Sequence, residues 1–380
     1  MLPLLQEVGD KIEKHIKEIT ESSDDGNIEL KDLMGKFSMD ALASCAFGVD
    51  SGSFSHKHSD SEFVRQAKIV FDFGSLKFFI SILVSIFTPK IVKQFFHALG
   101  FNRFATWSNL DANIFFQRVV EASIKQRKES KTRRNDLVDL MIDATEGTLD
   151  GTEDSETLDH EKERADKKKK DFDYEQVIST ATLLLVAGYD TTGTSMSWIL
   201  YELALNPDCQ ETLFEEISNA KDATGLTYDV IQGLPYLDAV IHETLRRHPV
   251  ISALERPCVK DYKLPNTDIV LKKGDWVRVN NMGICFDPDI YPNPEEWNPD
   301  NFSKENRATR NPYSFMAFSL GPRNCLAMRF AFFEMKVAVS HILMQFRLEA
   351  TSKTNRNAKI DPKAILGGAK DGLWIKFVER

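Results

Sequence analysis

The strongest chemical signal in the sequence is a cysteine that stands directly before a helical pattern. It closes a run with a Gly-Pro turn and an arginine, which reads Phe318, Ser319, Leu320, Gly321, Pro322, Arg323, Asn324 and Cys325. Backbone N–H groups and the dipole at a helix N-terminus favour a thiolate. A sulfur in that setting suits a metal ligand or a nucleophile, although a lone cysteine is more often an inert buried residue.

A second signal lies in the middle of a long apolar helical pattern, which reads Ala187, Gly188, Tyr189, Asp190, Thr191 and Thr192. An acid followed by two hydroxyl residues is costly there, because a buried charge needs partners and threonine competes for backbone hydrogen bonds. The segment is therefore either a helix kink with a locally satisfied Asp190 or a proton relay beside a reaction centre.

A third signal is the pair of Glu243 and Arg246 on the helix that follows Pro235. Their spacing puts both side chains on one face, where they can form an ion pair. His242 and Glu243 also begin the zinc-protease motif H-E-x-x-H, but Arg246 occupies the position of the second histidine. Taken alone, the pair is equally well explained as a surface ion pair of little energy.

The run that ends at Cys325 resembles the haem-thiolate loop of the cytochrome P-450 family, F-x-x-G-x-R-x-C, and the match continues to Ala331. It is closest to the microsomal animal branch, whose members oxidise xenobiotics and steroids. The resemblance implies that Cys325 is the axial ligand of haem b. It also implies that Arg323 and Arg256 each pair with a haem propionate and that Phe318 shields the sulfur.

The segment around Asp190 is similar to the oxygen-activation motif of the same family, A-G-x-D-T-T. The resemblance implies that Asp190 relays protons and that the Thr191 hydroxyl helps to deliver them to dioxygen at the iron. Gly188 would allow the helix to open locally. The resemblance therefore implies that the neighbouring residues Asp190 and Thr191 are catalytic.

Glu243 and Arg246 match the family's E-x-x-R motif, a structural lock behind the haem loop. The third partner of that lock is normally an arginine, and here it is Asn301, which lacks the guanidinium. The order of the motifs also places a few residues at the substrate cavity, although each is equally explicable as ordinary turn, strand or helix: Ala187, Ser252, Ala253, Leu254, Gly368 and Ala369.

The elements that must position these residues are mainly helical with small β-sheets, in one partial domain over 1–380. The expected fold is that of the cytochrome P-450 family, with a long central helix over the haem. Full-length members begin with a membrane anchor, a proline-rich hinge and an early propionate-clamping helix, so the front portion is expected to be missing before Met1. The expected parts are a helical front part (1–146), a charged loop (147–171), the central oxygen-activation helix (172–206), the E-x-x-R helix (235–248), a small sheet (257–279), and the Cys loop with its following helix (318–346).

Composition and short motifs exclude several other classes of function. The 380 residues contain 48 basic and 57 acidic side chains, a net charge of −9, so nucleic acid is not an expected partner. The sequence has neither a phosphate-binding loop nor G-x-G-x-x-G, so the chain itself should bind no nucleotide. The apolar runs at 78–89 and 177–189 are too short to span a membrane. A phenylalanine-rich stretch, 71–104, is either core or a surface that dips into lipid or lines an apolar entrance.

The resemblance implies a monooxygenase that inserts one atom of O2 into a lipophilic small molecule of the xenobiotic, steroid or fatty acid class. Electrons would come from NADPH–cytochrome P-450 reductase, which would dock where Arg323, Arg329 and Lys336 supply positive charge. The relatives face the cytosol from the endoplasmic reticulum membrane, with peripheral membrane contact expected here. The alternatives are a haem-poor fragment that only binds lipophiles and a peroxide-rearranging isomerase, which the Asp190–Thr191 pair disfavours.

Overall fold

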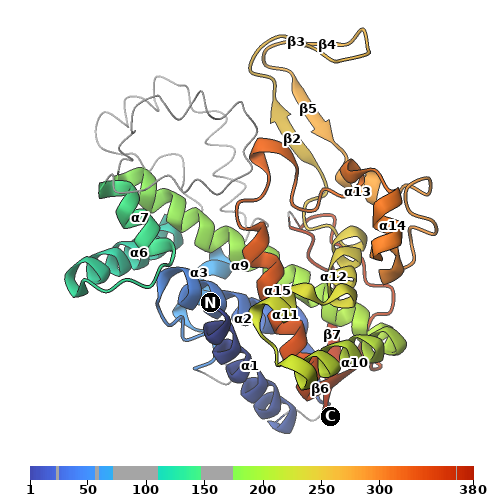
Figure 1. Ribbon diagram of the computed structural model, residues 1–380. Helices are drawn as coiled ribbons and strands as arrows, with labels where there is room; N and C mark the ends of the chain where they lie inside the picture. The colour runs from blue at the N-terminus through green and yellow to red at the C-terminus, as the bar shows by residue number, and fades with distance from the viewer. Residues whose placement is uncertain (23–24, 56–59, 72–109, 147–173, 365) are drawn as a thin grey trace. The chain divides into compact units, whose positions relative to one another are not determined.

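The computed structural model describes residues 1–22, 25–55, 60–71, 110–146, 174–364 and 366–380. These residues are mostly helical, with three small sheets whose strands pair antiparallel (Figure 1). The predicted mainly α fold with small β-sheets is therefore confirmed. The charged loop expected at 147–171 lies outside the described residues, as does almost all of the phenylalanine-rich stretch.

The chain divides into two compact units, one over 39–189 and one formed by 2–38 with 190–380. The division passes through two helices, α2 (Leu30–Leu42) and α9 (Tyr174–Leu205). The single domain expected over 1–380 stays a prediction.

The first unit contains, besides the shared helices, a π-helical turn and three further described helices: η1 (Ala43–Phe47), α3 (Glu62–Val70), α6 (Leu110–Ser130) and α7 (Leu137–Glu146). A buried guanidinium joins the last two helices. Arg127 near the end of α6 lies 2.8 Å from a carboxylate oxygen of Asp136 and 2.8 Å from one of Asp139. Two carboxylates around one arginine satisfy its charge inside the unit, as buried ions require.

The second unit holds the other described helices and short helical turns. They are α1 (Leu2–Ser22), α10 (Pro207–Thr224), α11 (Tyr228–Gly233), α12 (Pro235–Arg247), α13 (Asn281–Cys285), η2 (Pro299–Phe302), α14 (Lys304–Thr309), η3 (Pro312–Ser314), η4 (Gly321–Arg323) and α15 (Met328–Gln345). Proline opens α10 and α12, where its missing N–H has no intrahelical partner to lose. The buried stripe of α1, with Leu5, Ile12 and Ile16, packs against α15 (Figure 1).

The three sheets also belong to the second unit, and their strands are β1 (Asn27–Glu29), β2 (Leu254–Pro257), β3 (Tyr262–Lys263), β4 (Val270–Leu271), β5 (Trp276–Val279), β6 (Phe346–Glu349) and β7 (Trp374–Glu379). Their order is β1-β7-β6, β2-β5 and β3-β4. In β7, Ile375 and Phe377 are buried, the alternation of a strand with one covered face. The sheet expected at 257–279 is thus two separate strand pairs, and it starts three residues earlier, at Leu254.

The long helix expected over 172–206 is α9, and it ends one residue before Asn206, ahead of Pro207. Proline disfavours a helical conformation at the residue before it, so the helix stops there. In its second half α9 is covered on all sides, with Met196, Trp198, Ile199 and Leu200 fully buried. None of the helices in the described ranges combines the length and apolarity needed to cross a membrane.

Candidate functional site: the cysteine loop, the acidic motif and the E-x-x-R pair

Backbone hydrogen bonds hold the loop before α15 in a fixed shape. The Cys325 N–H donates to the Phe318 carbonyl at 2.8 Å, and the Asn324 N–H donates to the Gly321 carbonyl at 3.0 Å. Ser319 and Gly321 have φ angles of 61° and 77°, left-handed conformations that let the chain reverse sharply. Hydrogen bonds within the loop therefore stabilise its backbone, and the thiol of Cys325 forms no disulfide.

An exposed leucine follows Cys325 in the chain, and a phenylalanine anchors the loop to the next helix. Cys325 is an exposed free thiol, and the neighbouring Leu326 is 84% exposed. Phe318 packs against Phe332 of α15, with ring centroids 5.0 Å apart, so its ring fixes the loop to the helix. A thiol beside an uncovered leucine suits an apolar group that carries a soft metal.

Two guanidinium groups belong to the same loop region. Arg256 of β2 lies 3.4 Å from the Ser319 hydroxyl and 3.4 Å from the Arg323 carbonyl oxygen, and both arginines are exposed. Guanidinium groups bind carboxylates in bidentate pairs. A free thiol, an exposed leucine and two exposed arginines match what haem offers, namely iron, a porphyrin plane and two propionates. The residues present therefore fit haem, and the structure brings together Cys325, Arg323, Arg256 and Phe318.

The acid of the second motif is buried and paired with a lysine. Asp190 is 7% exposed, and its Oδ1 lies 3.3 Å from Nζ of Lys31 in α2. Burial raises the pKa of Asp190, and the Lys31 ammonium opposes that rise. A carboxyl with a raised pKa exchanges protons more readily near neutral pH than an exposed one. Sequence reasoning missed Lys31, because no spacing rule links it to a residue so distant in the chain.

The remainder of the motif packs tightly against α2. A Cβ at Gly193 would lie 3.2 Å from the Gly35 Cα, so the backbones of α9 and α2 meet at two glycines. The Ser195 hydroxyl donates to the Thr191 carbonyl at 2.9 Å, a bond that keeps Ser195 within its own helix. The helix is continuous through Gly188, where a Cβ would lie 2.9 Å from a methyl group of Leu42. The local opening expected at Gly188 stays a prediction, and Leu42 would have to shift to admit a larger residue there.

The E-x-x-R pair is part of a buried network. Glu243 and Arg246 have no exposed surface and share two hydrogen bonds of 2.8 Å. Arg246 also donates to three backbone carbonyls, those of Cys285, Pro294 and Glu296. A surface ion pair is therefore the wrong description. The network fixes three separate backbone positions relative to α12.

Asn301 occupies the third place in that network. Its Nδ2 donates to Glu243 Oε1 at 3.1 Å, and the backbone N–H of Asn298 donates to the same oxygen at 2.8 Å. The amide therefore retains one contact to the glutamate without a second guanidinium.

The residues assigned to the substrate cavity are not gathered into one described site. Ser252, Ala253 and Leu254 lead into β2, and the Ser252 carbonyl accepts a hydrogen bond from the Met282 N–H. A Cβ at Gly368 would lie 3.3 Å from Nζ of Lys31, which places this glycine beside the partner of Asp190. Ala369 pairs with Ile360 in an isolated β-bridge, and Ala187 is an exposed residue of the first unit.

One of the three residues that we expected to supply positive charge at the reductase-docking surface was wrongly assigned. Lys336 is buried, lies 3.0 Å from an Asp238 carboxylate oxygen and donates to the Gln232 carbonyl at 2.9 Å. The periodicity of α15 turns this position inward, and the ammonium is neutralised there. Arg323 and Arg329 are exposed and remain as candidates.

Comparisons with known proteins agree with these motifs. The family model described as Cytochrome P-450 matches residues 1–374. Cytochrome P-450 6k1 of Blattella germanica is 32% identical over 387 aligned residues, which cover 100% of this chain and 70% of that protein. Cytochrome P-450 9e2 of the same species is 36% identical, with 93% and 64% covered. Cytochrome P-450 3A2 of Rattus norvegicus is 32% identical, with 100% and 70% covered.

Proposed function

Because this chain belongs to the cytochrome P-450 family of haem-dependent monooxygenases, we propose that it oxidises a lipophilic small molecule with electrons that NADPH supplies through a separate reductase. The observation that supports this best is the free, exposed thiol of Cys325 on a loop that also carries Arg323 and is contacted by Arg256. The expected substrate belongs to the xenobiotic, steroid or fatty acid class. The expected location is the cytosolic face of the endoplasmic reticulum membrane.

The proposed cofactor is haem b, whose iron would be held by the sulfur of Cys325. When bound, haem supplies the activation of dioxygen from which one atom enters the substrate. Arg323 and Arg256 bind the propionates, which orients the porphyrin, and Phe318 excludes water from the sulfur. The hydrogen bond from the Cys325 N–H to Phe318 keeps the backbone of the ligand fixed before the metal is present.

The proton-handling residues lie in α9. We assign the transfer of protons to the Asp190 carboxyl and their delivery to the Thr191 hydroxyl, which follows it in the chain. Lys31 lies 3.3 Å from the carboxyl, and its ammonium opposes the effect of burial, which raises the pKa of Asp190. The buried lock of Glu243, Arg246 and Asn301 supports the region by fixing backbone positions from Cys285 to Asn301.

Substrate contacts are assigned to the residues that the family resemblance places at the cavity, namely Ala187, Ser252, Ala253, Leu254, Gly368 and Ala369. Among these, Gly368 has the strongest support, since it lies beside Lys31 and thus next to the proton-handling pair. Apart from Leu254, these residues are small and would leave room for a bulky apolar molecule.

The test is isotope incorporation by the haem-loaded chain with NADPH–cytochrome P-450 reductase. Lauric acid, testosterone and 7-ethoxycoumarin serve as probes of the three substrate classes, and 18O2 is the oxygen source. We expect at least one probe to gain a single labelled oxygen atom in a reaction that needs both NADPH and the reductase. Products that carry no label, or that form equally well without reductant, would contradict the proposal.

A further inference from the structure

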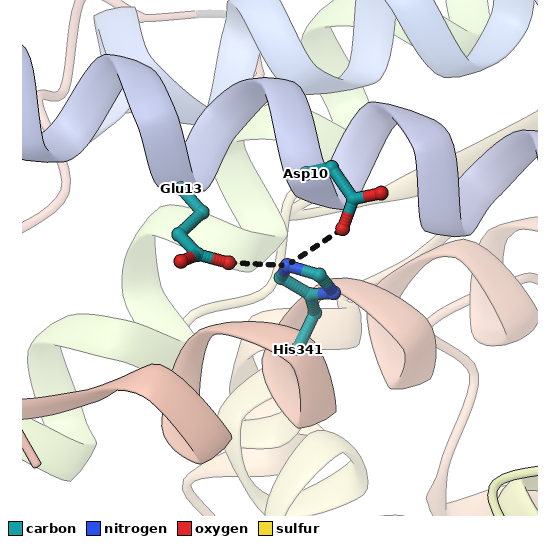
Figure 2. A group of neighbouring side chains, drawn as sticks. All are labelled: Asp10, Glu13 and His341. Carbon is teal, nitrogen blue, oxygen red and sulfur yellow. Dashed lines mark ion pairs between the residues drawn. The ribbon is translucent and has the colours of Figure 1, made fainter.

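Three side chains with metal-binding atoms converge outside the proposed haem site. Asp10 and Glu13 belong to α1 and His341 belongs to α15, and their ligand atoms all lie within 4.8 Å of one another. His341 Nε2 is 3.4 Å from Glu13 Oε2 and 3.8 Å from Asp10 Oδ1. Figure 2 shows both carboxylates directed at the same nitrogen of the imidazole ring.

These distances are long for hydrogen bonds and suitable for a shared cation. An N–H···O bond spans about 2.7–3.2 Å. His341 Nε2 is buried and has no hydrogen-bond partner in the described part of the chain. Zinc binds nitrogen and oxygen ligands at about 2.0–2.2 Å in tetrahedral geometry, so neighbouring ligand atoms lie roughly 3.4 Å apart. The separation of His341 from Glu13 already matches one edge of such a tetrahedron.

The fold holds Glu13 and His341 in place, whereas Asp10 is more exposed. Asp10 and Glu13 are three residues apart on α1 and so share one face of the helix. Gly9 lets the imidazole lie against α1, because a Cβ there would be 2.7 Å from His341 Nδ1. The side chains of His341 and Glu13 are 17% and 22% exposed, whereas Asp10 is 76% exposed. Asp10 can therefore close the last few tenths of an ångström, and its open side admits water.

The nearby lysine pairs with only one of the two Glu13 carboxylate oxygens. Glu13 Oε1 lies 2.9 Å from Nζ of Lys17, which also lies 3.6 Å from Glu379. Glu13 Oε2 is the atom that faces His341. Lys14 lies 3.9 Å from Glu18. With a neutral imidazole, the three ligands carry a charge of −2, which Lys17 reduces only in part.

We propose that Asp10, Glu13 and His341 form a surface site for a divalent transition-metal ion of the Zn2+ type, completed by water. Imidazole with carboxylates favours such ions over Mg2+ and Ca2+, which prefer all-oxygen sites. The metal joins α1 to α15, the helix that begins just after Cys325. The competing explanation is a protonated His341 that forms ion pairs with both carboxylates and binds no metal.

Zinc binding to the 380-residue chain separates these two explanations. Exposed thiols are first blocked with N-ethylmaleimide, so that Cys325 does not bind the ion, and Zn2+ is titrated by calorimetry near pH 7.5. We expect one zinc site that His341→Gln and Glu13→Gln weaken at least tenfold. Excess Mg2+ does not displace the zinc. The matched control is Glu7→Gln, which removes a carboxylate from the same helix and leaves zinc binding unchanged.

A change in fold is separated from loss of a ligand by two further measurements. Asp10→Asn, at an exposed position, should weaken zinc binding several-fold while circular dichroism stays that of the wild type. Zinc should also raise the melting temperature of the wild type and not that of His341→Gln, since a ligand of the native state stabilises it by mass action. Equal zinc affinity in wild type and His341→Gln overturns the proposal. So does a melting temperature that responds to pH but not to zinc.

Discussion

At the scale of single residues, the buried carboxyl groups differ in the partners that offset the cost of burying their charge. Asp190 has the Lys31 ammonium at 3.3 Å, and Glu243 has Arg246 and Asn301. Glu334 of α15 is also fully buried, but only a hydroxyl, that of Ser38, opposes the effect of burial on its pKa. Compensation by a cation leaves a carboxylate able to ionise, whereas burial without one favours the neutral acid.

Thr191→Ala should separate the consumption of reductant from the formation of product. Without the hydroxyl beside Asp190, protons would no longer be directed productively, and more of the reduced oxygen would be released with two protons as hydrogen peroxide instead of entering the product. The measurement compares NADPH consumed, peroxide released and product formed in the system with reductase. Thr180→Ala is the matched control, because Thr180 lies in the same helix but is exposed. Unchanged coupling in Thr191→Ala would remove Thr191 from the proposed relay.

Glu334 makes stability depend on pH. Burial raises the pKa of its carboxyl to about 8, from 4.5 for an ordinary glutamate. The folded protein therefore keeps this proton where the unfolded chain releases it, so the stabilisation is complete below pH 4.5 and is lost as the pH rises through 8. At about 1.4 kcal/mol per pKa unit, the free energy of unfolding should fall by several kcal/mol over this range.

Urea unfolding at a series of pH values measures that loss. Glu334→Gln should flatten the pH dependence, while Glu215→Gln, at an exposed position of α10, should keep it. The assignment fails if the two variants and the wild type follow the same curve.

At the scale of elements, α9 is positioned by close contact with α2 and by buried hydrogen bonds further along. Gly193 meets Gly35 of α2, and the Trp198 indole donates to the Gly367 carbonyl at 2.9 Å. His248 stacks on Trp198 with ring centroids 3.7 Å apart and binds Glu202 at 2.6 Å. These contacts fix α9 from Asp190 to its C-terminal end, which includes the proposed relay.

Gly193→Ala should destabilise the second unit. A methyl group would lie 3.2 Å from the Gly35 Cα and 3.3 Å from its nitrogen, and backbone atoms cannot yield as a side chain does. Overpacking of this kind costs about 1–3 kcal/mol. Gly233→Ala is the control, since nothing lies within 4 Å of a Cβ there. Chemical unfolding compares the two variants, and equal stabilities would show that the helices can separate at little cost.

Arg246→Met should be more damaging than any surface substitution on α12. It leaves the Glu243 carboxylate buried without its cation and three backbone carbonyls without a donor, a loss of about 3–5 kcal/mol. Arg247→Met, which removes a neighbouring guanidinium bound to the Glu295 carbonyl, should cost far less. The free energy of unfolding is the measurement. A similar cost for both variants would mean that the buried network does not support the fold.

The sequence predicted those parts of the site that are local in the chain. The loop from Phe318 to Cys325 is one continuous motif with its own turn residues, and Glu243 and Arg246 are related by helical spacing. The family motif also predicted Asn301 as the third partner of Glu243, although the two residues are far apart in sequence. Lys31 and the close approach of Gly35 to Gly193 likewise depend on distant segments, and no motif indicated them. Lys336 was misassigned for the same reason, because its burial depends on packing by other elements.

At the scale of the whole molecule, the net charge is −9, yet three arginines lie near Cys325 in the chain or contact its loop. Arg256, Arg323 and Arg329 are exposed close to Cys325 in the fold or in the chain, and they suit both haem propionates and an acidic redox partner. Every functional step proposed above depends on the same premise, that the Cys325 sulfur binds the haem iron as a thiolate.

The absorption spectrum of the reduced, carbon monoxide-bound protein tests that premise most directly. Wild type reconstituted with haem, and the control Cys258→Ser, should both show the red-shifted Soret band of thiolate ligation, and Cys325→Ser should lose it. A band that persists in Cys325→Ser, or that never forms in a folded, haem-loaded wild type, would contradict the assignment of Cys325 as the iron ligand.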